Sequence, residues 1–251
     1  MKNYLQLYLL LLISISYSNK AHSQTNTGSW QLGANIGIAV YQGDLTPYRS
    51  GSYKILKPSI GFNISRIFTP DLKLRTSIAL GQLKGDEGLY VKPPYRKERN
   101  LSFTTSFVEI SEILIWNFLD KSSDISYKRF SPYIFGGVGV SLLNINRSSS
   151  KTTAAYLLNE PIATAGLLQD LQTAPPKVIL VFPAGIGLEI FISPSVSLNA
   201  EINFRYTRTD YLDGFSKIAN PKVNDYFYTN TIGIIYKLGK KDLLGCPVLK
   251  L

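Results

Sequence analysis

The sequence predicts an all-β fold, an eight-stranded antiparallel transmembrane β-barrel of the outer-membrane type, and three observations favour it. The chain begins with an export leader. Eight segments alternate apolar and polar residues with the period of two that a half-buried strand requires. The connections alternate between short turns and long loops, an arrangement in which the short turns are periplasmic and the long loops extracellular.

The leader is a secretory signal peptide over residues 1–23. Lys2 precedes an apolar run from Leu5 to Ile15, and Ala21-His22-Ser23 gives a small-x-small cleavage pattern. That run is too short for a comfortable transmembrane helix, although an uncleaved anchor is the alternative. We therefore expect a barrel over residues 24–240 and a periplasmic C-terminal tail over 241–251, with both termini in the periplasm.

Composition limits the possible functions. The complete chain has 27 Lys and Arg against 17 Asp and Glu, and cleavage would remove His22, its single histidine. Cys246 is the single cysteine, so an intrachain disulfide is excluded. The loop at 84–99 is mildly basic, which suits retention next to outer-membrane lipid and the anionic lipopolysaccharide of the outer leaflet and does not imply nucleic acid.

The predicted strands share one pattern, in which the apolar face carries Leu, Ile, Val and Phe while the polar face carries Gly, Ser, Asn and Thr. Small polar residues suit the crowded interior of an eight-stranded barrel, and the apolar face suits lipid. A soluble sandwich would instead expose flexible charged residues on its polar face. The strands are expected at about 30–40, 57–68, 72–83, 100–118, 131–145, 177–192, 196–206 and 225–238.

Two details of the strands need comment. In the fourth, Leu101, Phe103 and Phe107 have the opposite parity to the later apolar residues, and a β-bulge between Phe107 and Leu114 would reconcile them. Aromatic residues at strand ends are expected to form interfacial girdles. They are Trp30, Tyr41, Phe68, Phe118, Tyr133, Tyr206, Tyr226 and Tyr236.

The connections supply an independent test of the barrel. Tight turns are expected at 69–71 and 193–195, and an intermediate link at about 120–129. The long loops are 43–56, 84–99, 146–176 and 209–224. Within 146–176, the segments Ala154–Leu158 and Ala163–Leu171 are expected to form short helices, as a cap over the barrel mouth, a partner contact or a simple surface loop.

Charged residues from several strands are predicted to face the lumen. Because unpaired charges there would be costly, acids and bases should pair across the interior. A gated pore and a paired-carboxylate catalytic site are the functional alternatives. The lumen network consists of Arg75, Glu109, Glu112, Glu189, Glu201 and Arg205, with Lys73 and Lys237 beside it.

The sequence predicts no catalytic residue, cofactor site or metal site. A mature chain without histidine lacks the usual base for hydrolysis or acyl transfer, and it has no His and Cys pairs for metal ligation. Glycines at 136, 137 and 139 are not followed by a helix start with Lys-Ser/Thr, so a phosphate loop is not indicated.

Several segments in order resemble the PorG-like outer-membrane barrel family of Bacteroidota, over nearly the whole mature chain. The more specific one is Thr209-Asp210-Tyr211-Leu212-Asp213, at the end of the seventh strand. The others are Gly43-Asp44-Leu45, Asn100-Leu101-Ser102-Phe103, Glu109-Ile110-Ser111, Trp116-Asn117-Phe118, the run Phe130 to Gly139 and Pro183-Ala184-Gly185-Ile186-Gly187.

The resemblance implies a non-enzymatic component of the type IX protein secretion machinery. In that family, the barrel tethers periplasmic ring proteins of the PorK and PorN kind to the outer membrane. For this chain, the expected contact surfaces are Asp120 to Arg129 and the tail from Gly239. A narrow pore for small solutes is the main alternative, and a lipid-modifying enzyme is the least favoured one.

Overall fold

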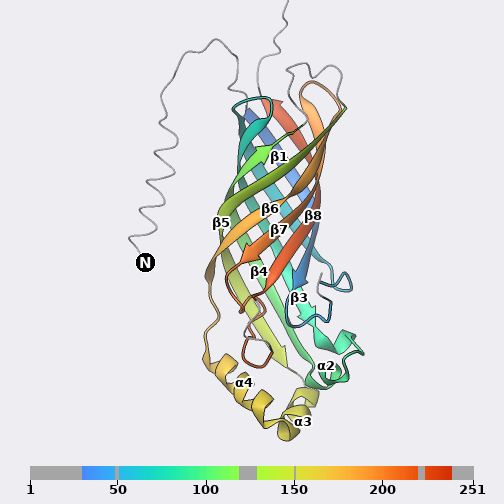
Figure 1. Ribbon diagram of the computed structural model, residues 1–251, viewed down its shortest axis with the longest axis vertical. Helices are drawn as coiled ribbons and strands as arrows, with labels where there is room; N and C mark the ends of the chain where they lie inside the picture. Colours follow the sequence, from blue (N-terminus) through green and yellow to red (C-terminus); the bar gives the residue numbers. More distant parts are fainter. Residues whose placement is uncertain (1–29, 49–50, 119–128, 150, 220–223, 239–251) are drawn as a thin grey trace, which may run out of the picture.

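The computed structural model describes residues 30–48, 51–118, 129–149, 151–219 and 224–238. They form a closed barrel of eight antiparallel strands, each paired with its neighbours in the sequence (Figure 1). The predicted fold class is therefore confirmed. The strands are β1 (Trp30–Gln42), β2 (Lys57–Ile67), β3 (Leu72–Asp86), β4 (Leu101–Trp116), β5 (Phe130–Ser149), β6 (Val178–Phe191), β7 (Val196–Thr207) and β8 (Tyr226–Leu238).

The barrel closes where the first strand meets the last. β1 and β8 pair antiparallel along their whole lengths, from Trp30 opposite Leu238 to Gln42 opposite Tyr226. The ladder between β5 and β6 is interrupted at Gly137 and Val138, opposite Pro183 and Phe182. Closure joins the eight strands in a ring, so the wall has no free strand along its length. This is the form in which a β-sheet can stand in hydrocarbon.

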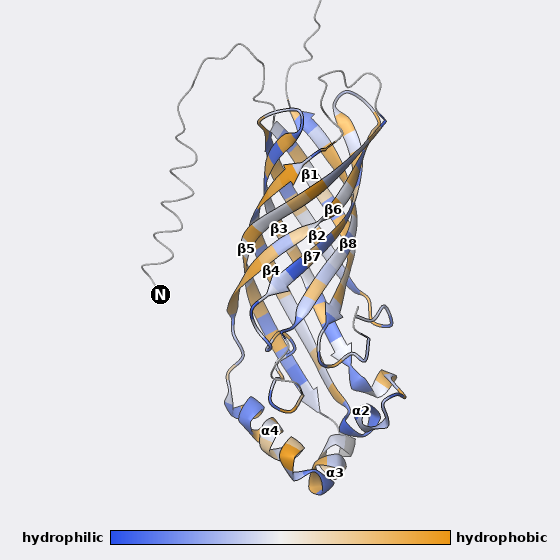
Figure 2. Ribbon diagram, in the orientation of Figure 1, coloured by the Kyte–Doolittle hydropathy of each residue, from blue (hydrophilic) through white to orange (hydrophobic). Residues whose placement is uncertain are grey.

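The two faces of the wall follow the alternation predicted from the sequence. Outward-facing apolar side chains are strongly exposed, as at Ile36 (61%), Ile186 (57%) and Ile232 (63%). Figure 2 shows hydrophobic and hydrophilic residues alternating along the strands. Inward positions carry buried polar residues such as Asn35 and Ser59. An apolar outside around a polar inside is the architecture of an outer-membrane barrel.

The two ends of the barrel differ in their connections. Residues 68–71 and 192–195 form short turns at one end, called here the turn end. At the opposite end, the loop end, long connections carry η1 (Glu87–Leu89), α2 (Pro94–Arg99), α3 (Lys151–Asn159) and α4 (Pro161–Gln172). Trp30 and Leu238, the outer ends of β1 and β8, both lie at the turn end (Figure 1).

The helices α3 and α4 occupy the two segments where the sequence predicted short helices. Among the helices of the described residues, none is long and apolar enough to cross a membrane. The predicted leader (1–23), the tail (241–251) and most of the predicted contact surface at Asp120 to Arg129 lie outside the described residues.

The β-bulge predicted in the fourth strand is absent. β4 pairs without interruption with β3, from Trp116 opposite Leu72 to Ser102 opposite Asp86, and its register with β5 is also continuous. Phe103 and Phe107 therefore point into the barrel, where they are buried. The change of parity in the sequence marks a change in the lining of the interior rather than an extra residue.

Two of the predicted girdle residues also point inward. Tyr41 and Tyr133 are both buried, and their hydroxyl groups bond to carboxylates inside the barrel. They occupy the inward parity of their strands, which nearness to a strand end does not reveal. Exposed aromatic side chains at strand ends do include Trp30, Phe68, Phe118, Tyr206 and Tyr236, while Tyr226 is half-buried.

Candidate functional site

Three buried ion pairs cross the interior of the barrel. They join β3 to β6, β3 to β7 and β4 to β7, which are not neighbours in the wall, so each pair spans the lumen. The pairs are Lys73 Nζ with Glu189 Oε2 at 2.8 Å, Arg75 Nη1 with Glu201 Oε1 at 2.7 Å, and Arg205 Nε with Glu109 Oε2 at 2.7 Å. Five of the six residues predicted for the lumen network thus meet in pairs.

Neutral side chains complete the bonding of these carboxylates. The hydroxyl of Tyr133 donates to Glu201 Oε1 at 2.5 Å, and Asn199 Nδ2 donates to the same oxygen at 3.1 Å. Ser197 donates to Glu189 Oε1 at 2.6 Å. Buried charges are tolerated when they are paired and hydrogen-bonded in this way. The sequence indicated the charges but not these neutral partners.

Glu112 is the sixth predicted lumen residue, and the prediction is wrong. Glu109 and Glu112 are three positions apart on one strand, so they lie on opposite faces of the wall. The structure places Glu109 inside, whereas Glu112 faces outward, where its Oε1 accepts a hydrogen bond from Thr76 Oγ1 at 2.7 Å. The sequence alone did not decide which of the two acids faces the lumen, and so both were included in the network.

An apolar plug fills the interior toward the loop end. It combines inward side chains of the strands with side chains that the long loops insert between them. The strands contribute Ala39, Tyr41, Ala79, Leu83, Leu101, Phe103, Phe107, Leu143, Ile179, Val181 and Phe227, and the loops contribute Leu45, Leu167, Leu212, Phe215 and Ile218. The lumen is thus closed by packed side chains at this end.

The long loops above the plug are bound to one another in a cap, which comprises residues 43–48, 51–56, 87–100, 151–177, 208–219 and 224–225. The buried Arg99 joins three of the loops: it pairs with Glu87 (Nη2 to Oε1, 2.5 Å), donates to the Ile218 carbonyl, and through its own carbonyl accepts from Thr153. Arg96 Nη1 donates to the Asp44 carbonyl at 2.6 Å, which ties in the first long loop.

Asp170, in α4, organises the last long loop. Its buried carboxylate accepts from the backbone amides of Ser216, Lys217 and Ile218 at 2.9 to 3.2 Å. Gly214, just before this segment, has a φ of +84°, and an added Cβ would meet the side chain of Arg147. A residue with a side chain would be strained there, so glycine permits the close approach of loop and strand.

Tyr41 connects two buried carboxyl groups beneath the cap. Its hydroxyl lies 2.7 Å from Asp213 Oδ2 and 2.8 Å from Asp225 Oδ1. The other oxygens of these carboxyls accept from the backbone amides of Phe215 and Leu212. A hydroxyl has one proton and can donate to one oxygen only, so the second contact requires a proton on a carboxyl group.

Burial raises the pKa of both acids well above the ordinary range of aspartate, in agreement with a shared proton. For Asp225, the nearby charge of Asp213 adds to the increase. Desolvation also raises the pKa of Asp210 to about 7, with Asp44 and Asp170 adding to the shift. The cap is therefore expected to respond to pH.

The family motif Thr209 to Asp213 lies in the cap. Leu212 is fully buried in the plug, and Tyr211 donates from its hydroxyl to Asp170 Oδ1 at 3.3 Å. Thr209 accepts at its hydroxyl from the amide of Tyr211. Together with Asp213, these residues fix the last long loop on the barrel mouth. The sequence placed the motif at the end of the seventh strand but did not indicate this role in closing the barrel.

The described residues contain no group of three or more His, Cys, Asp or Glu side chains arranged to hold a metal ion. The carboxylates of the interior are bonded to arginine, lysine and hydroxyl groups rather than left open toward a cavity. These side chains therefore neutralise one another's charges and help to close the lumen.

The match to a protein family covers almost the whole chain. The family model described as "Domain of unknown function (DUF6089)" matches residues 5–241. The chain belongs to the DUF6089 family. No curated protein matches this DUF6089 chain.

Solved outer-membrane barrels resemble this DUF6089 chain in fold at low sequence identity. Neisserial surface protein A is 14% identical, with 83% of this chain and 97% of that chain covered and a TM-score of 0.47. OprG of Pseudomonas aeruginosa is 10% identical, with 85% and 97% covered and a TM-score of 0.46. Ail, the attachment invasion locus protein of Yersinia pestis, is 10% identical, with 84% and 99% covered and a TM-score of 0.45.

Proposed function

We propose that this DUF6089 barrel is a non-enzymatic structural component of the outer membrane that anchors periplasmic ring proteins of the type IX protein secretion machinery. In this proposal the loop end faces the outside of the cell, and the turn end and both termini face the periplasm. The single observation that carries the structural role is the filled interior. Ion pairs cross the lumen, and the plug and the cap close its loop end.

Because the interior is filled, we assign the function to the outer surfaces of the barrel. The type IX assignment rests on the resemblance to the PorG-like family, including the motif Thr209 to Asp213. Because this motif lies in the cap, it supports folding of the loop end rather than contact with periplasmic proteins. The proposed contacts are at the turn end, beside the expected surfaces Asp120 to Arg129 and the tail from Gly239.

Deletion of the gene, followed by assay of secreted proteins in the medium, tests the proposal in the cell. We expect type IX cargo to be lost from the medium and restored by the complete chain. Normal secretion in the deletion strain would contradict the anchoring role.

A photo-crosslinking experiment tests the contact surface directly. Pro70 and Pro194 are exposed in the two short turns, and Pro161 is exposed in the cap. A photo-reactive residue at either turn position should capture a periplasmic ring protein, whereas the same residue at Pro161 should capture none. Capture from Pro161 alone would place the partner on the wrong side of the membrane and overturn the proposed orientation.

The pore alternative makes a separate expectation. Planar bilayers containing the purified barrel should show almost no conductance, because side chains occupy the lumen. Steady single-channel currents, reduced when Arg75 or Glu201 is replaced, would favour a pore instead.

A further inference from the structure

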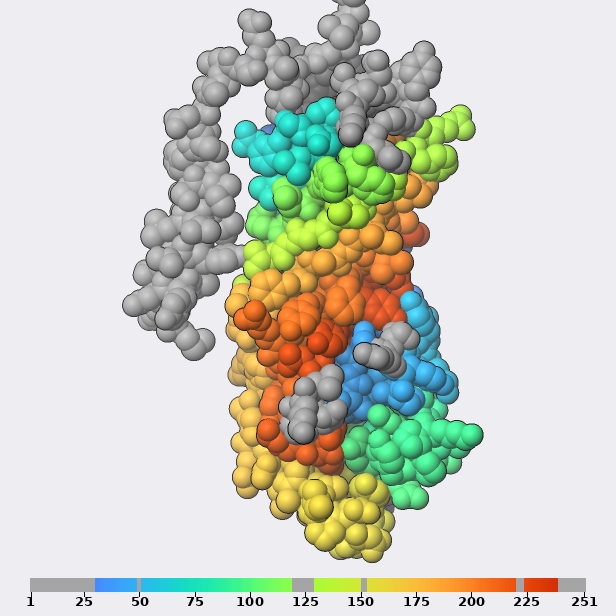
Figure 3. All heavy atoms as spheres, in the orientation of Figure 1, coloured from blue at the N-terminus to red at the C-terminus, as the bar shows by residue number. Residues whose placement is uncertain are grey.

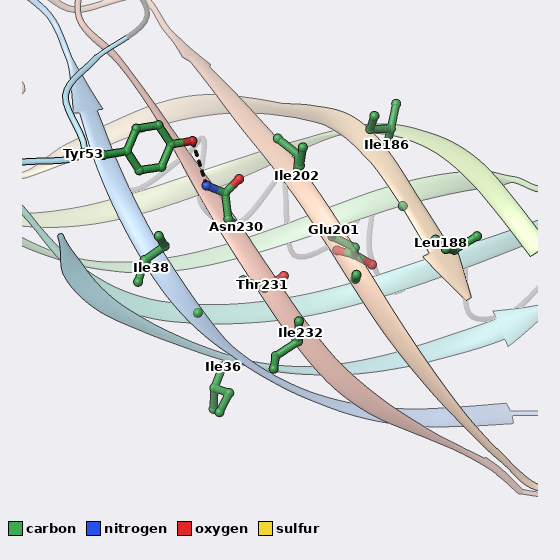
Figure 4. Close-up of a pocket in the computed structure, with 13 residues that line it drawn as sticks. Ile36, Ile38, Tyr53, Ile186, Leu188, Glu201, Ile202, Asn230, Thr231 and Ile232 are labelled. Carbon is green, nitrogen blue, oxygen red and sulfur yellow. Dashed lines mark hydrogen bonds between the residues drawn. The ribbon is translucent and has the colours of Figure 1, made fainter. Parts of the chain in front are cut away.

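An apolar groove of about 690 Å³ runs across the outer wall of the barrel over β6, β7, β8 and β1 (Figure 4). Its volume is within the range of about 300–1,000 Å³ that is typical of small-molecule sites. Figure 3 presents this side of the molecule, with β6 to β8 in orange to red beside β1 in blue. The groove lies on the membrane-facing wall, and one of its lining residues is Glu201, whose carboxylate pairs with Arg75 in the interior.

The strand register explains why the wall is hollowed at this place. One row of outward residues runs Leu188, Ala200, Ile232 and Ile36 across the four strands. The neighbouring row places Asn230 between Ile202 and Ile38. The methyl group of Ala200 is short beside the longer side chains of its row and so leaves a depression. The isoleucines that line the groove are labelled in Figure 4.

One end of the groove is polar. Asn230 Nδ2 donates to the hydroxyl of Tyr53 at 3.1 Å, and Figure 4 shows the amide oxygen of Asn230 on the side away from this bond. The ring of Tyr53 packs edge-on against Tyr228 at 6.0 Å. An outward-facing amide in a hydrocarbon-facing wall is costly unless it has partners. The amide oxygen of Asn230 can accept a hydrogen bond from a polar group of a bound lipid.

The groove runs from its polar end, at Asn230 and Tyr53 near the loop end, along the wall to Ala200 and Leu188, which lie closer to the turn end. Tyr206 and Tyr226, in ring contact at 5.3 Å, mark the interface at the loop end on β7 and β8. Asn230 follows Tyr226 by four residues, or about 13 Å of strand. Above the aromatic residues, Arg208 is exposed, with its guanidinium 5.7 Å from the ring of Phe182. A cation at this level attracts a lipid with an anionic head group.

We propose that the groove is a specific site for one acyl chain of lipopolysaccharide. The inference rests on the orientation in the proposed function, which places the loop end in the outer leaflet. Lipopolysaccharide supplies anionic phosphates toward Arg208, hydroxyl groups toward Asn230, and a hydrocarbon chain for the depression at Ala200. A phospholipid lacks hydroxyl groups on its acyl chains and fits the polar end less well.

Native mass spectrometry of the purified full-length barrel tests this site. The protein is reconstituted with equal amounts of lipid A and phosphatidylethanolamine, and retained lipids are counted after detergent exchange. Wild type should retain one lipid A, and Ala200→Phe should reduce this retention at least tenfold by filling the depression. Ala184→Phe is the matched control, since Ala184 is an exposed, outward alanine on β6 beyond the groove.

Asn230→Leu separates a specific site from general adhesion of lipid. It makes the wall more apolar, so non-specific adhesion would increase, whereas loss of the polar contact should reduce lipid A retention several-fold. Equal retention in Ala200→Phe and Ala184→Phe would overturn the proposal, and so would preferred retention of phosphatidylethanolamine. Because this measurement uses purified protein, its outcome is independent of the secretion assay that tests the proposed function.

Discussion

The two ends of the barrel interior are filled in different ways. Toward the turn end, charged side chains from opposite walls neutralise one another across the lumen, beside a small buried cluster of Ile113, Ile115, Tyr133 and Phe135. Toward the loop end, apolar side chains of strands and loops pack together as they do in a water-soluble protein. Arg205 lies at the boundary, where it pairs with Glu109 and places its guanidinium 5.2 Å from the ring of Phe227.

The difference follows from which parts of the chain can fill the interior at each end. At the turn end, the connections 68–71 and 192–195 are too short to enter the barrel, so the strands must fill the space with long side chains. At the loop end, long connections fold back and insert Leu212 and Phe215 between the strands. We therefore expect substitutions at the turn end to weaken the whole barrel and substitutions in the cap to act locally.

The largest effect is expected from Glu201→Ala. The change leaves Arg75 buried without its carboxylate and deprives Tyr133 and Asn199 of an acceptor. Removing one partner of a buried ion pair lowers the free energy of unfolding by about 3–5 kcal/mol. Urea unfolding from lipid vesicles measures this loss. Glu112→Gln is the control and should change stability little, because Glu112 faces outward. Equal losses of stability in both variants would show that the Arg75–Glu201 pair contributes no more to stability than an outward carboxylate.

A smaller and more local effect is expected from Leu212→Ala, which opens a cavity in the plug. Truncation of a fully buried leucine lowers stability by about 2–5 kcal/mol. The cap should become sensitive to protease while the strands remain folded, which limited proteolysis with circular dichroism can separate. Leu168→Ala is the control, since Leu168 is 55% exposed on α4. Cleavage that requires complete unfolding of the barrel would contradict local opening.

A third prediction concerns Tyr41→Phe, which keeps the ring in the plug and removes the hydroxyl between Asp213 and Asp225. An unsatisfied buried polar group costs about 1–3 kcal/mol. Hydrogen exchange at the amides of Leu212 and Phe215 should accelerate accordingly. Tyr206→Phe, on the outer surface, should leave these amides unchanged, and a similar acceleration in both variants would remove the proposed role of the hydroxyl.

The smallest expected effect is a dependence of the cap on pH. An aspartate whose pKa is raised by folding binds its proton more tightly in the folded state, so its contribution is fully present at low pH. For Asp210, that contribution is lost as pH rises from about 4, the ordinary pKa of aspartate, to its folded pKa of about 7. Protection of the cap amides, corrected for intrinsic exchange, should therefore decrease over this interval.

Asp210→Asn should reduce this slope, although Asp213 and Asp225 still contribute to it because burial raises the pKa of both. Asp71→Asn, in a short turn at the opposite end, serves as the control. An unchanged slope in Asp210→Asn would mean that other groups govern the response.

Much of the wall could be predicted from the sequence, since a period of two decides which side chains share a face. The strand positions and the alternation of short and long connections follow from local patterns of this kind. The interior could be predicted only in part. Charges at Arg75 and Glu201 indicated a lumen network, but their pairing depends on which strands lie opposite in the closed barrel, and that is set by register.

Two of the errors have a common physical origin. Phe103 and Tyr41 were assigned to a bulge and to a girdle because apolar and aromatic residues were expected to face lipid along the whole strand. Near the loop end, however, the interior is itself apolar, so a hydrophobic residue suits either face there. The sequence pattern does not indicate the depth at which the lining of the interior changes from polar to apolar. For the same reason, it does not decide which of Glu109 and Glu112 faces the interior.

The pairing of β1 with β8 has a consequence for biogenesis. The first and the last strand of the barrel are hydrogen-bonded neighbours, so the cylinder cannot seal until β8 has followed the other seven strands across to the outer membrane. A truncated chain would present two open sheet edges to the bilayer. Trp30 and Leu238 both lie at the turn end, so a short linker can join β8 to β1 there. If the chain is then opened at another turn, we expect the resulting circular permutant still to insert into the membrane.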